Sequence, residues 1–109
     1  MKITIVLVSM LAASAAMAAT PDTGQTVYEH WCAPCHAPGP GHPGTQSLQL
    51  KYKGTPPAVL LERTDLTPQA ISVFVRQGVL LMAPFRKTEI SDKELAALTA
   101  YIANSARKR

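Results

Sequence analysis

Helical periodicity dominates this sequence and indicates an all-α protein. Apolar residues recur every three or four positions in several stretches, and prolines and glycines cluster between them. No run alternates between apolar and polar residues as a half-buried strand would. The 109 residues allow one small domain. A Rossmann domain or a (β/α) barrel needs a longer chain, which excludes most architectures of stand-alone enzymes.

The first 18 residues have the features of a secretory signal peptide. Lys2 is followed by an apolar run and then by Ala16-Met17-Ala18, an Ala-x-Ala cleavage site. The alternative is an uncleaved membrane anchor, since no charge lies between Lys2 and Asp22, but the second half of that stretch is only weakly apolar. We expect cleavage after Ala18, a mature domain of residues 19–109 with no stable membrane insertion, and a periplasmic location.

The charge of the chain gives little information about partners. The net charge is +4. Removing Lys2 from the 11 basic residues leaves 10 against 7 acidic ones, and three of those ten form the C-terminal run Arg107-Lys108-Arg109. Residues 19–106 are therefore balanced. No basic stripe with interleaved aromatic residues is present, so nucleic-acid binding has no support.

The first predicted helix begins at Asp22, with Gln25 three residues later as a loose capping box. Its apolar residues share one face at helical spacing: Val27, Tyr28, Trp31, Cys32 and Cys35. The following stretch, Ala37–Pro57, holds 5 of the 9 prolines and 4 of the 6 glycines. We expect it to be a loop, and a loop of this length usually encloses something.

Three further helices are predicted in the second half of the chain. A short one covers Ala58–Arg63, and the next has Thr67 as N-cap, Pro68 at the first helical position and Gly78 as terminator. A loop over Val79–Glu89 follows. The last helix begins with a capping box and continues with an apolar stripe; these residues are Ser91 and Glu94, then Leu95, Leu98, Tyr101 and Ile102.

Both cysteines lie in one motif, Trp31-Cys32-Ala33-Pro34-Cys35-His36. A structural zinc site needs four ligands, and neither His30 nor His42 has the expected spacing. A disulfide would close only a tiny loop and stabilise little. In thioredoxin-like proteins a Trp-Cys-x-Pro-Cys motif follows a strand and starts a helix, whereas here it ends one. A thiol-disulfide oxidoreductase using Cys32 and Cys35 is kept as the alternative function.

The spacing Cys-x-x-Cys-His is typical of c-type haem attachment. Two thiols at this spacing can each add to one vinyl group on the same edge of a porphyrin, and the adjacent histidine is then held at the iron. We therefore expect one covalently attached haem c, with thioether bonds from Cys32 and Cys35. His36 is the expected proximal ligand of the iron.

A second axial ligand is expected from the methionines. Three of the four, Met1, Met10 and Met17, belong to the predicted leader, so Met82 is the only one in residues 19–109. Methionine is often core filler, but Met82 lies in a predicted loop with a proline nearby. We expect Met82 to bind the iron, with His42 and His30 as the alternatives. His/Met ligation raises the reduction potential and leaves no open coordination position.

The chain resembles the class I cytochromes c over essentially all of residues 19–109. Gly24, Tyr28 and Cys32 match the Gly-x-x-x-aromatic-x-x-x-Cys approach to the haem motif, and the stripe of the last helix matches the helix that crosses the first one near that glycine. The resemblance implies about three to five helices around one haem. It also implies single-electron transfer rather than enzymatic bond chemistry.

Two details of that resemblance concern the axial ligands. The family has a Met-Pro loop, whereas here Ala83 separates Met82 from Pro84. In the family, a proline carbonyl accepts a hydrogen bond from the proximal histidine, which orients and strengthens that ligand. We expect Pro43 in this role, with Pro40 and Pro38 as alternatives.

A narrower resemblance is to the small cytochrome subunits of flavocytochromes that oxidise 4-alkylphenols, such as cresol methylhydroxylase or eugenol hydroxylase. It is carried by His42-Pro43-Gly44-Thr45, Arg63-Thr64-Asp65-Leu66-Thr67-Pro68 and Phe85-Arg86-Lys87-Thr88-Glu89. It implies a donor dehydrogenase with a flavoprotein subunit. The acceptor would be a cytochrome, an oxidase or a copper protein of the respiratory chain.

Two kinds of surface could contact such partners. Basic side chains could border the haem edge and steer an acidic partner; they are Lys51, Lys53, Arg76, Arg86 and Lys87. Alternatively, docking rests on apolar contacts around the haem edge from Leu80, Leu81 and Phe85.

Overall fold

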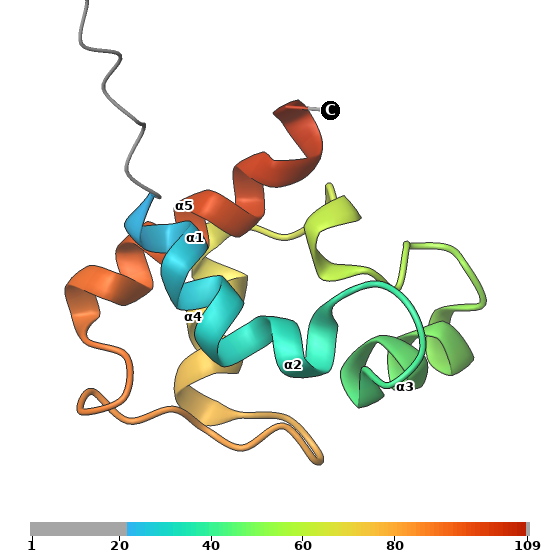
Figure 1. The fold of residues 1–109 in the computed structure, drawn as a ribbon, viewed down its shortest axis with the longest axis horizontal. Coiled ribbons are helices and arrows are strands. Elements are labelled where there is room, and N and C mark those ends of the chain that lie inside the picture. The colour runs from blue at the N-terminus through green and yellow to red at the C-terminus, as the bar shows by residue number, and fades with distance from the viewer. Residues whose placement is uncertain (1–21, 109) are drawn as a thin grey trace, which may run out of the picture.

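The computed structural model describes residues 22–108, and their fold is all-α (Figure 1). The predicted signal peptide lies outside these residues. Within them, β-type pairing is limited to one antiparallel bridge between Val79 and Met82. No helix in this part of the chain combines the length and the apolar character that a membrane span requires.

The first helix runs from Thr23 to His36 in three parts: α1 (Thr23–Val27), the π-helical turn η1 (Tyr28–Cys32) and α2 (Ala33–His36). In η1 the N–H of Ala33 donates to the carbonyl of Tyr28, a bond that spans five residues and widens the turn just before the cysteine motif. The motif therefore ends a helix, as the periodicity predicts.

The predicted capping box at the start of this helix is wrong. Asp22 is the N-cap residue, but its side chain makes no capping hydrogen bond. Gln25 instead donates from Nε2 to Oε1 of Glu29, 2.7 Å away and one turn further along the same helix face.

The prediction that Ala37–Pro57 is a loop is also wrong, because its middle forms α3 (Pro43–Tyr52). Pro43 occupies the first helical turn, where a missing N–H removes no helical hydrogen bond. Residues 45–52 contain neither proline nor glycine. Lys53 ends the helix in a left-handed conformation with φ 52°. The helix breakers of this stretch thus flank a helix.

The second half of the chain follows the prediction closely. It contains the 3-10 turn η2 (Leu60–Glu62), α4 (Pro68–Gln77), α5 (Asp92–Ser105) and the 3-10 turn η3 (Ala106–Lys108). Thr67 caps α4 by accepting from the N–H of Ala70 at 3.1 Å. Both bonds of the Ser91–Glu94 capping box are present. The helix expected over Ala58–Arg63 is reduced to η2.

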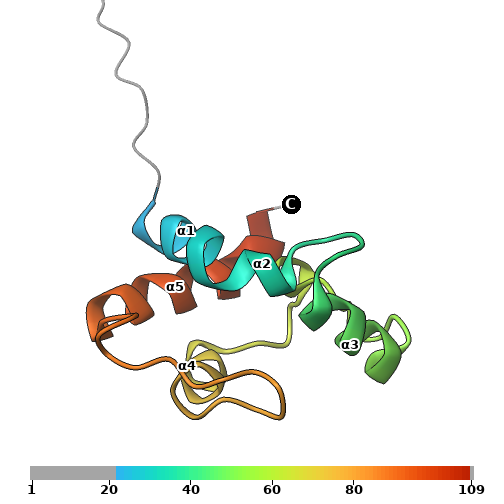
Figure 2. The same cartoon turned by 60° about the horizontal axis from the view of Figure 1, so that its bottom comes forward.

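The helices α1 and α5 cross in direct contact, with α4 beneath them (Figures 1 and 2). A side chain at Gly24 would overlap the carbonyl of Ala97 and lie 2.7 Å from Cβ of Tyr101, so only glycine allows this crossing. The most deeply buried side chains are Ile90, which precedes α5, and Leu98 and Ile102 from the inner face of α5. The core therefore holds the cysteine-bearing helix against α4 and α5.

We expect Gly24→Ala to destabilise the protein by about 1–3 kcal/mol, because the added methyl group must push two helix backbones apart. Urea unfolding of the purified protein measures this effect. Thr23→Ala is the matched control, since Thr23 is exposed on the same helix. Equal stability of the two variants would contradict the close crossing.

Candidate functional site

A cavity of about 690 Å³ opens between the end of the first helix, α3, α4 and the segment that follows α4. Its wall is largely apolar and contains all four predicted ligands: Cys32, Cys35, His36 and Met82. Figure 2 shows α2 on one side of the molecule and the segment after α4 on the other. The structure thus brings together residues that lie far apart in the sequence.

The two cysteines are free thiols with different surroundings, Cys32 buried and Cys35 exposed. Burial, and secondarily the neighbouring Cys35, raises the pKa of the Cys32 thiol to about 11. A reactive dithiol needs a lowered thiol pKa, usually at a helix N-terminus, whereas this motif lies at a C-terminal end. Residues 22–108 also contain no cluster of three metal-ligating side chains that would suit zinc. The thiol-disulfide and zinc interpretations are therefore not supported.

His36 is packed against the first turn of α3. A Cβ atom at Gly44 would lie 2.9 Å from Cε1 and 3.0 Å from Nδ1 of the imidazole, so a side chain at this position would displace the ring. Burial lowers the pKa of His36 and favours the neutral ring, the form that binds metals. Gly44 is not among the site residues predicted from the sequence. The sign that could have pointed to it is its position directly after Pro43, the residue expected to bond to His36.

The predicted hydrogen bond from His36 to Pro43 is absent. Nδ1 of His36 is buried and has no hydrogen-bond partner among the described residues, which also excludes Pro40 and Pro38 as acceptors in this structure. The physical reason is that Pro43 starts α3, and a carbonyl in a helix points along the helix axis toward the residue four positions later.

Two other hydrogen bonds fasten α3 to the cysteine motif. Thr45, which is buried, donates from Oγ1 to the carbonyl of Ala37 at 2.9 Å. Nδ1 of His42 lies 3.0 Å from the carbonyl of Pro34, and because a carbonyl only accepts, Nδ1 must carry the proton. His42 therefore connects the two segments.

The segment around Met82 is tightly held. The N–H and carbonyl groups of Val79 and Met82 bond to one another at 2.9 Å in both directions. Gly78 has φ 69°, and a Cβ there would lie 2.9 Å from the nitrogen of Pro84, so this turn requires glycine. At the far end, the N–H of Phe85 donates to the carbonyl of Val75 at 2.8 Å.

Arg76 braces the same segment from α4. Its Nη1 donates to the carbonyls of Phe85 at 3.2 Å and Ile90 at 2.9 Å, and its Nη2 lies 2.9 Å from Asp92. The ammonium group of Lys87, and then the Arg76 guanidinium, lower the pKa of the Asp92 carboxyl. Arg76 was considered above as a partner-steering cation, but the structure makes it a structural brace.

The alternative axial ligands lie elsewhere. His42 is bonded to Pro34, and the ring of His30 packs edge-on against Trp31 with centroids 4.6 Å apart. Neither histidine lines the cavity, whereas Met82 does.

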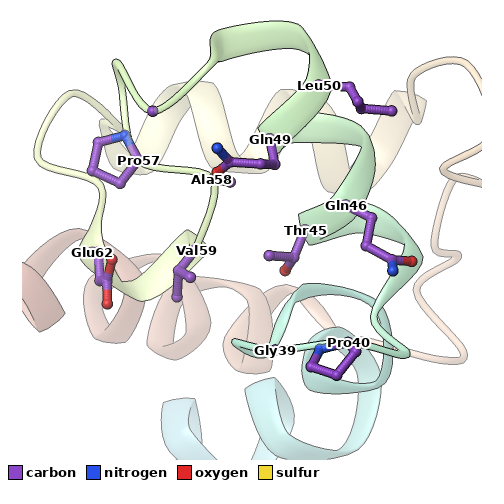
Figure 3. A pocket seen from close by; sticks show the side chains of 11 residues that line it. Gly39, Pro40, Thr45, Gln46, Gln49, Leu50, Pro57, Ala58, Val59 and Glu62 are labelled. Atoms are coloured by element: carbon purple, nitrogen blue, oxygen red, sulfur yellow. The ribbon is translucent and has the colours of Figure 1, made fainter.

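A second depression, of about 970 Å³, lies beside α3 (Figure 3). The picture shows Thr45 and Gln49 of α3 extending toward the segment that carries Ala58 and Val59. No cysteine, histidine, methionine or aromatic residue lines it. Despite its volume, it lacks the residues that hold a haem.

An all-α fold around an apolar cavity with Cys-x-x-Cys-His in its wall defines a c-type cytochrome. The chain belongs to the family described as cytochrome C oxidase, cbb3-type, subunit III, whose family model matches residues 19–102. No curated protein and no solved structure matches the chain. The protein is thus an electron-transfer protein of the class I cytochrome c type with covalently bound haem c, and it exchanges electrons with redox-partner proteins.

The residues present fit this cofactor. The cavity combines an apolar wall with two free thiols, a half-buried imidazole whose Nδ1 has no partner, and one thioether. A haem iron with histidine and thioether ligands exchanges single electrons between Fe(III) and Fe(II). The chain's own contribution is to orient His36 through α3, to hold Met82 through Gly78 and Arg76, and to exclude water with apolar side chains.

Proposed function

We propose that this chain is an exported monohaem cytochrome that carries single electrons between periplasmic proteins. In this proposal residues 1–18 are removed as a signal peptide, and residues 19–109 are the mature domain. Cys32 and Cys35 bind the haem, and His36 and Met82 are its axial ligands. The observation that carries the proposal is that all four of these side chains line one largely apolar cavity.

We propose further that the electron donor is a periplasmic flavoprotein dehydrogenase that oxidises 4-alkylphenols. The acceptor in the respiratory chain is a cytochrome, an oxidase or a copper protein. The support is the resemblance of three segments to the cytochrome subunits of such enzymes. The first of them, residues 42–45, contains Gly44 against His36, and the second contains the buried Arg63. Both segments therefore contribute residues to the wall of the cavity.

Mixing the oxidised cytochrome with a 4-alkylphenol-reduced flavoprotein in a stopped-flow spectrometer tests this donor. We expect each molecule of 4-alkylphenol that is oxidised to reduce two molecules of the cytochrome, because each haem accepts one electron. A periplasmic quinoprotein alcohol dehydrogenase, reduced by its own substrate, serves as the comparison donor. If the quinoprotein reduced the cytochrome and the flavoprotein did not, the choice of a flavoprotein donor would be overturned, and the electron-transfer function would stand.

Apolar contact is the better-supported mode of docking. Arg76 and Lys87 both pair with Asp92 at 2.9 Å, and Arg86 lies 3.6 Å from Glu89. Leu80 and Leu81 are 97% and 100% exposed at the turn before Met82. Phe85 is not part of this surface, because its ring packs against Trp31 with centroids 5.6 Å apart. Three of the five candidate cations thus have acidic partners of their own, and such cations steer an acidic protein only weakly.

We therefore expect the rate of association with the donor to change less than about threefold between 50 and 200 mM salt, whereas charge-steered association falls steeply. Leu81→Ser should slow association about tenfold. The matched control is Val73→Ser, which changes an exposed apolar residue on α4. A steep salt dependence together with an unaffected Leu81→Ser variant would contradict apolar docking.

A further inference from the structure

The segment that carries Met82 is connected to the rest of the fold by hydrogen bonds to α4. The N–H of Phe85 donates to the carbonyl of Val75 at 2.8 Å, and its carbonyl accepts from Nη1 of Arg76 at 3.2 Å. The N–H of Gly78 donates to the carbonyl of Phe74, the third contact with α4. These bonds place the segment against one wall of the cavity, but they do not connect it to the wall that carries the cysteine motif.

A pair of aromatic rings makes that connection. Trp31 directly precedes Cys32, and its ring meets the ring of Phe85 edge-on, with centroids 5.6 Å apart and an angle of 72° between the ring planes. Aromatic pairs prefer this kind of arrangement. Both rings line the cavity and pack against the hydrophobic core. The contact therefore joins the helix that carries both cysteines to the segment that carries Met82.

Phe85 is also the side chain through which this segment returns to the core. Within residues 79–85, only Met82 and Phe85 are not exposed. Leu80 and Leu81 point into solvent, and Leu80 has φ 52°, a left-handed conformation that is costly for leucine. The turn before Met82 thus gains nothing from side-chain packing of its own. The position of Met82 relative to the cysteine motif depends on the ring of Phe85 and its contact with Trp31.

We propose that Trp31 is a positioning residue for Met82 and acts on it through Phe85. The two rings hold the Met82 segment against the cysteine-bearing helix, so that small molecules do not replace the thioether at the iron. This inference rests on the axial ligation by Met82 proposed above. Its consequence is a protein that exchanges electrons and resists the binding of an external ligand.

The strength of an aromatic pair sets the size of the expected effect. An external ligand reaches the iron only in the fraction of molecules whose Met82 has moved away, and loss of the ring contact raises that fraction. A pair of this kind changes such an equilibrium by roughly two- to tenfold. The effect is local, because α1 and α5 still cross in contact at Gly24.

Imidazole binding to the ferric holoprotein, followed by loss of the absorption band of thioether-bound haem, measures this fraction. We expect Trp31→Leu and Phe85→Leu each to raise the association constant of imidazole about fivefold. The double variant should bind imidazole about as tightly as either single variant, since both substitutions remove the same contact. Trp31→Phe keeps an aromatic ring and should restore most of the native resistance to imidazole.

Phe74→Leu is the matched control. Phe74 also lines the cavity, but its ring does not belong to the pair formed by Trp31 and Phe85. We expect this control to bind imidazole as the native protein does. A purely structural role of Trp31 would lower the urea concentration at which the protein unfolds and leave imidazole binding without urea unchanged.

NMR of the reduced holoprotein tests the contact itself. Trp31 is the only tryptophan of the chain, so its indole protons have an unambiguous assignment. We expect nuclear Overhauser effects between these protons and the ring of Phe85. Their absence would overturn the inference. If Trp31→Leu yields no holoprotein, these effects and the Phe85→Leu variant decide the matter.

Two further results would overturn the inference: native imidazole affinity in both Trp31→Leu and Phe85→Leu, or effects that multiply in the double variant. Met82→Ala separates the inference from the ligation on which it rests. If Met82→Ala binds imidazole much more tightly than the native protein, the ligation stands even where the ring variants show no effect. If the native protein binds imidazole as tightly as Met82→Ala, the ligation and the inference both fail.

Discussion

Replacing both Cys32 and Cys35 with alanine is expected to leave a chain that does not fold cooperatively. The described core is small and is built largely from one face of α5 and the helices beside it. The cavity next to it is lined by apolar side chains such as Leu66, Ile71 and Val75, which an attached haem would cover. A domain of this size rarely builds enough core from its own side chains.

Far-ultraviolet circular dichroism and urea titration of the double variant, purified from the periplasm, measure this loss. We expect most of the helical signal to disappear and no sigmoidal transition to remain. Pro34→Ala is the matched control, because it changes an exposed residue between the two cysteines and keeps their spacing. A double variant with native helicity and a cooperative transition would show that the haem is not part of the core.

Replacing Met82 with alanine is expected to produce the largest change in redox behaviour. A thioether ligand favours Fe(II), so its loss lowers the reduction potential. We expect a fall of roughly 0.1–0.2 V, a modest part of the range of about 0.8 V that axial ligands cover. The long-wavelength absorption band of thioether-bound ferric haem should also disappear. The protein should remain folded, because Gly78 and Arg76 hold the segment through backbone contacts.

Spectra and redox titrations of three variants separate the candidate ligands. His30→Ala is the matched control, since the imidazole packs against Trp31 outside the cavity. We expect this control to keep the native spectrum. An unchanged spectrum in Met82→Ala, together with a changed one in His42→Ala, would move the axial position to His42.

Local signals in the sequence predicted much of the fold. Thr67, Pro68 and Gly78 mark the ends of α4, and the Ser91–Glu94 capping box marks the start of α5, because each acts through hydrogen bonds within a few residues. The helix crossing at Gly24 is instead implied by the resemblance to class I cytochromes c, and the contact depends on the absence of a side chain there.

The errors arise where a residue has two possible local roles. Pro43 was counted as a helix breaker, although proline also starts helices, and α3 was missed for that reason. The same helix start turns the carbonyl of Pro43 away from the predicted bond to His36. Gln25 pairs with Glu29 rather than with the helix N-terminus, since side chains one turn apart compete with a cap.

The residues that sequence reasoning missed depend on tertiary structure. Arg63 is a basic residue in a connecting segment, where exposure is the ordinary expectation, and only the folded chain places it in the cavity wall. Arg76 lies on a helix face that gives no sign of the carbonyls of Phe85 and Ile90. The π-helical turn at Tyr28–Cys32 likewise has no local sequence signature.

The intact mass of the denatured protein, purified from the periplasm of a host that matures c-type cytochromes, is the most direct test of covalent attachment. We expect the mass of residues 19–109 plus one haem, retained under denaturing conditions. A mass equal to the polypeptide alone, with two thiols free to react with an alkylating reagent, would contradict the attachment of haem at Cys32 and Cys35.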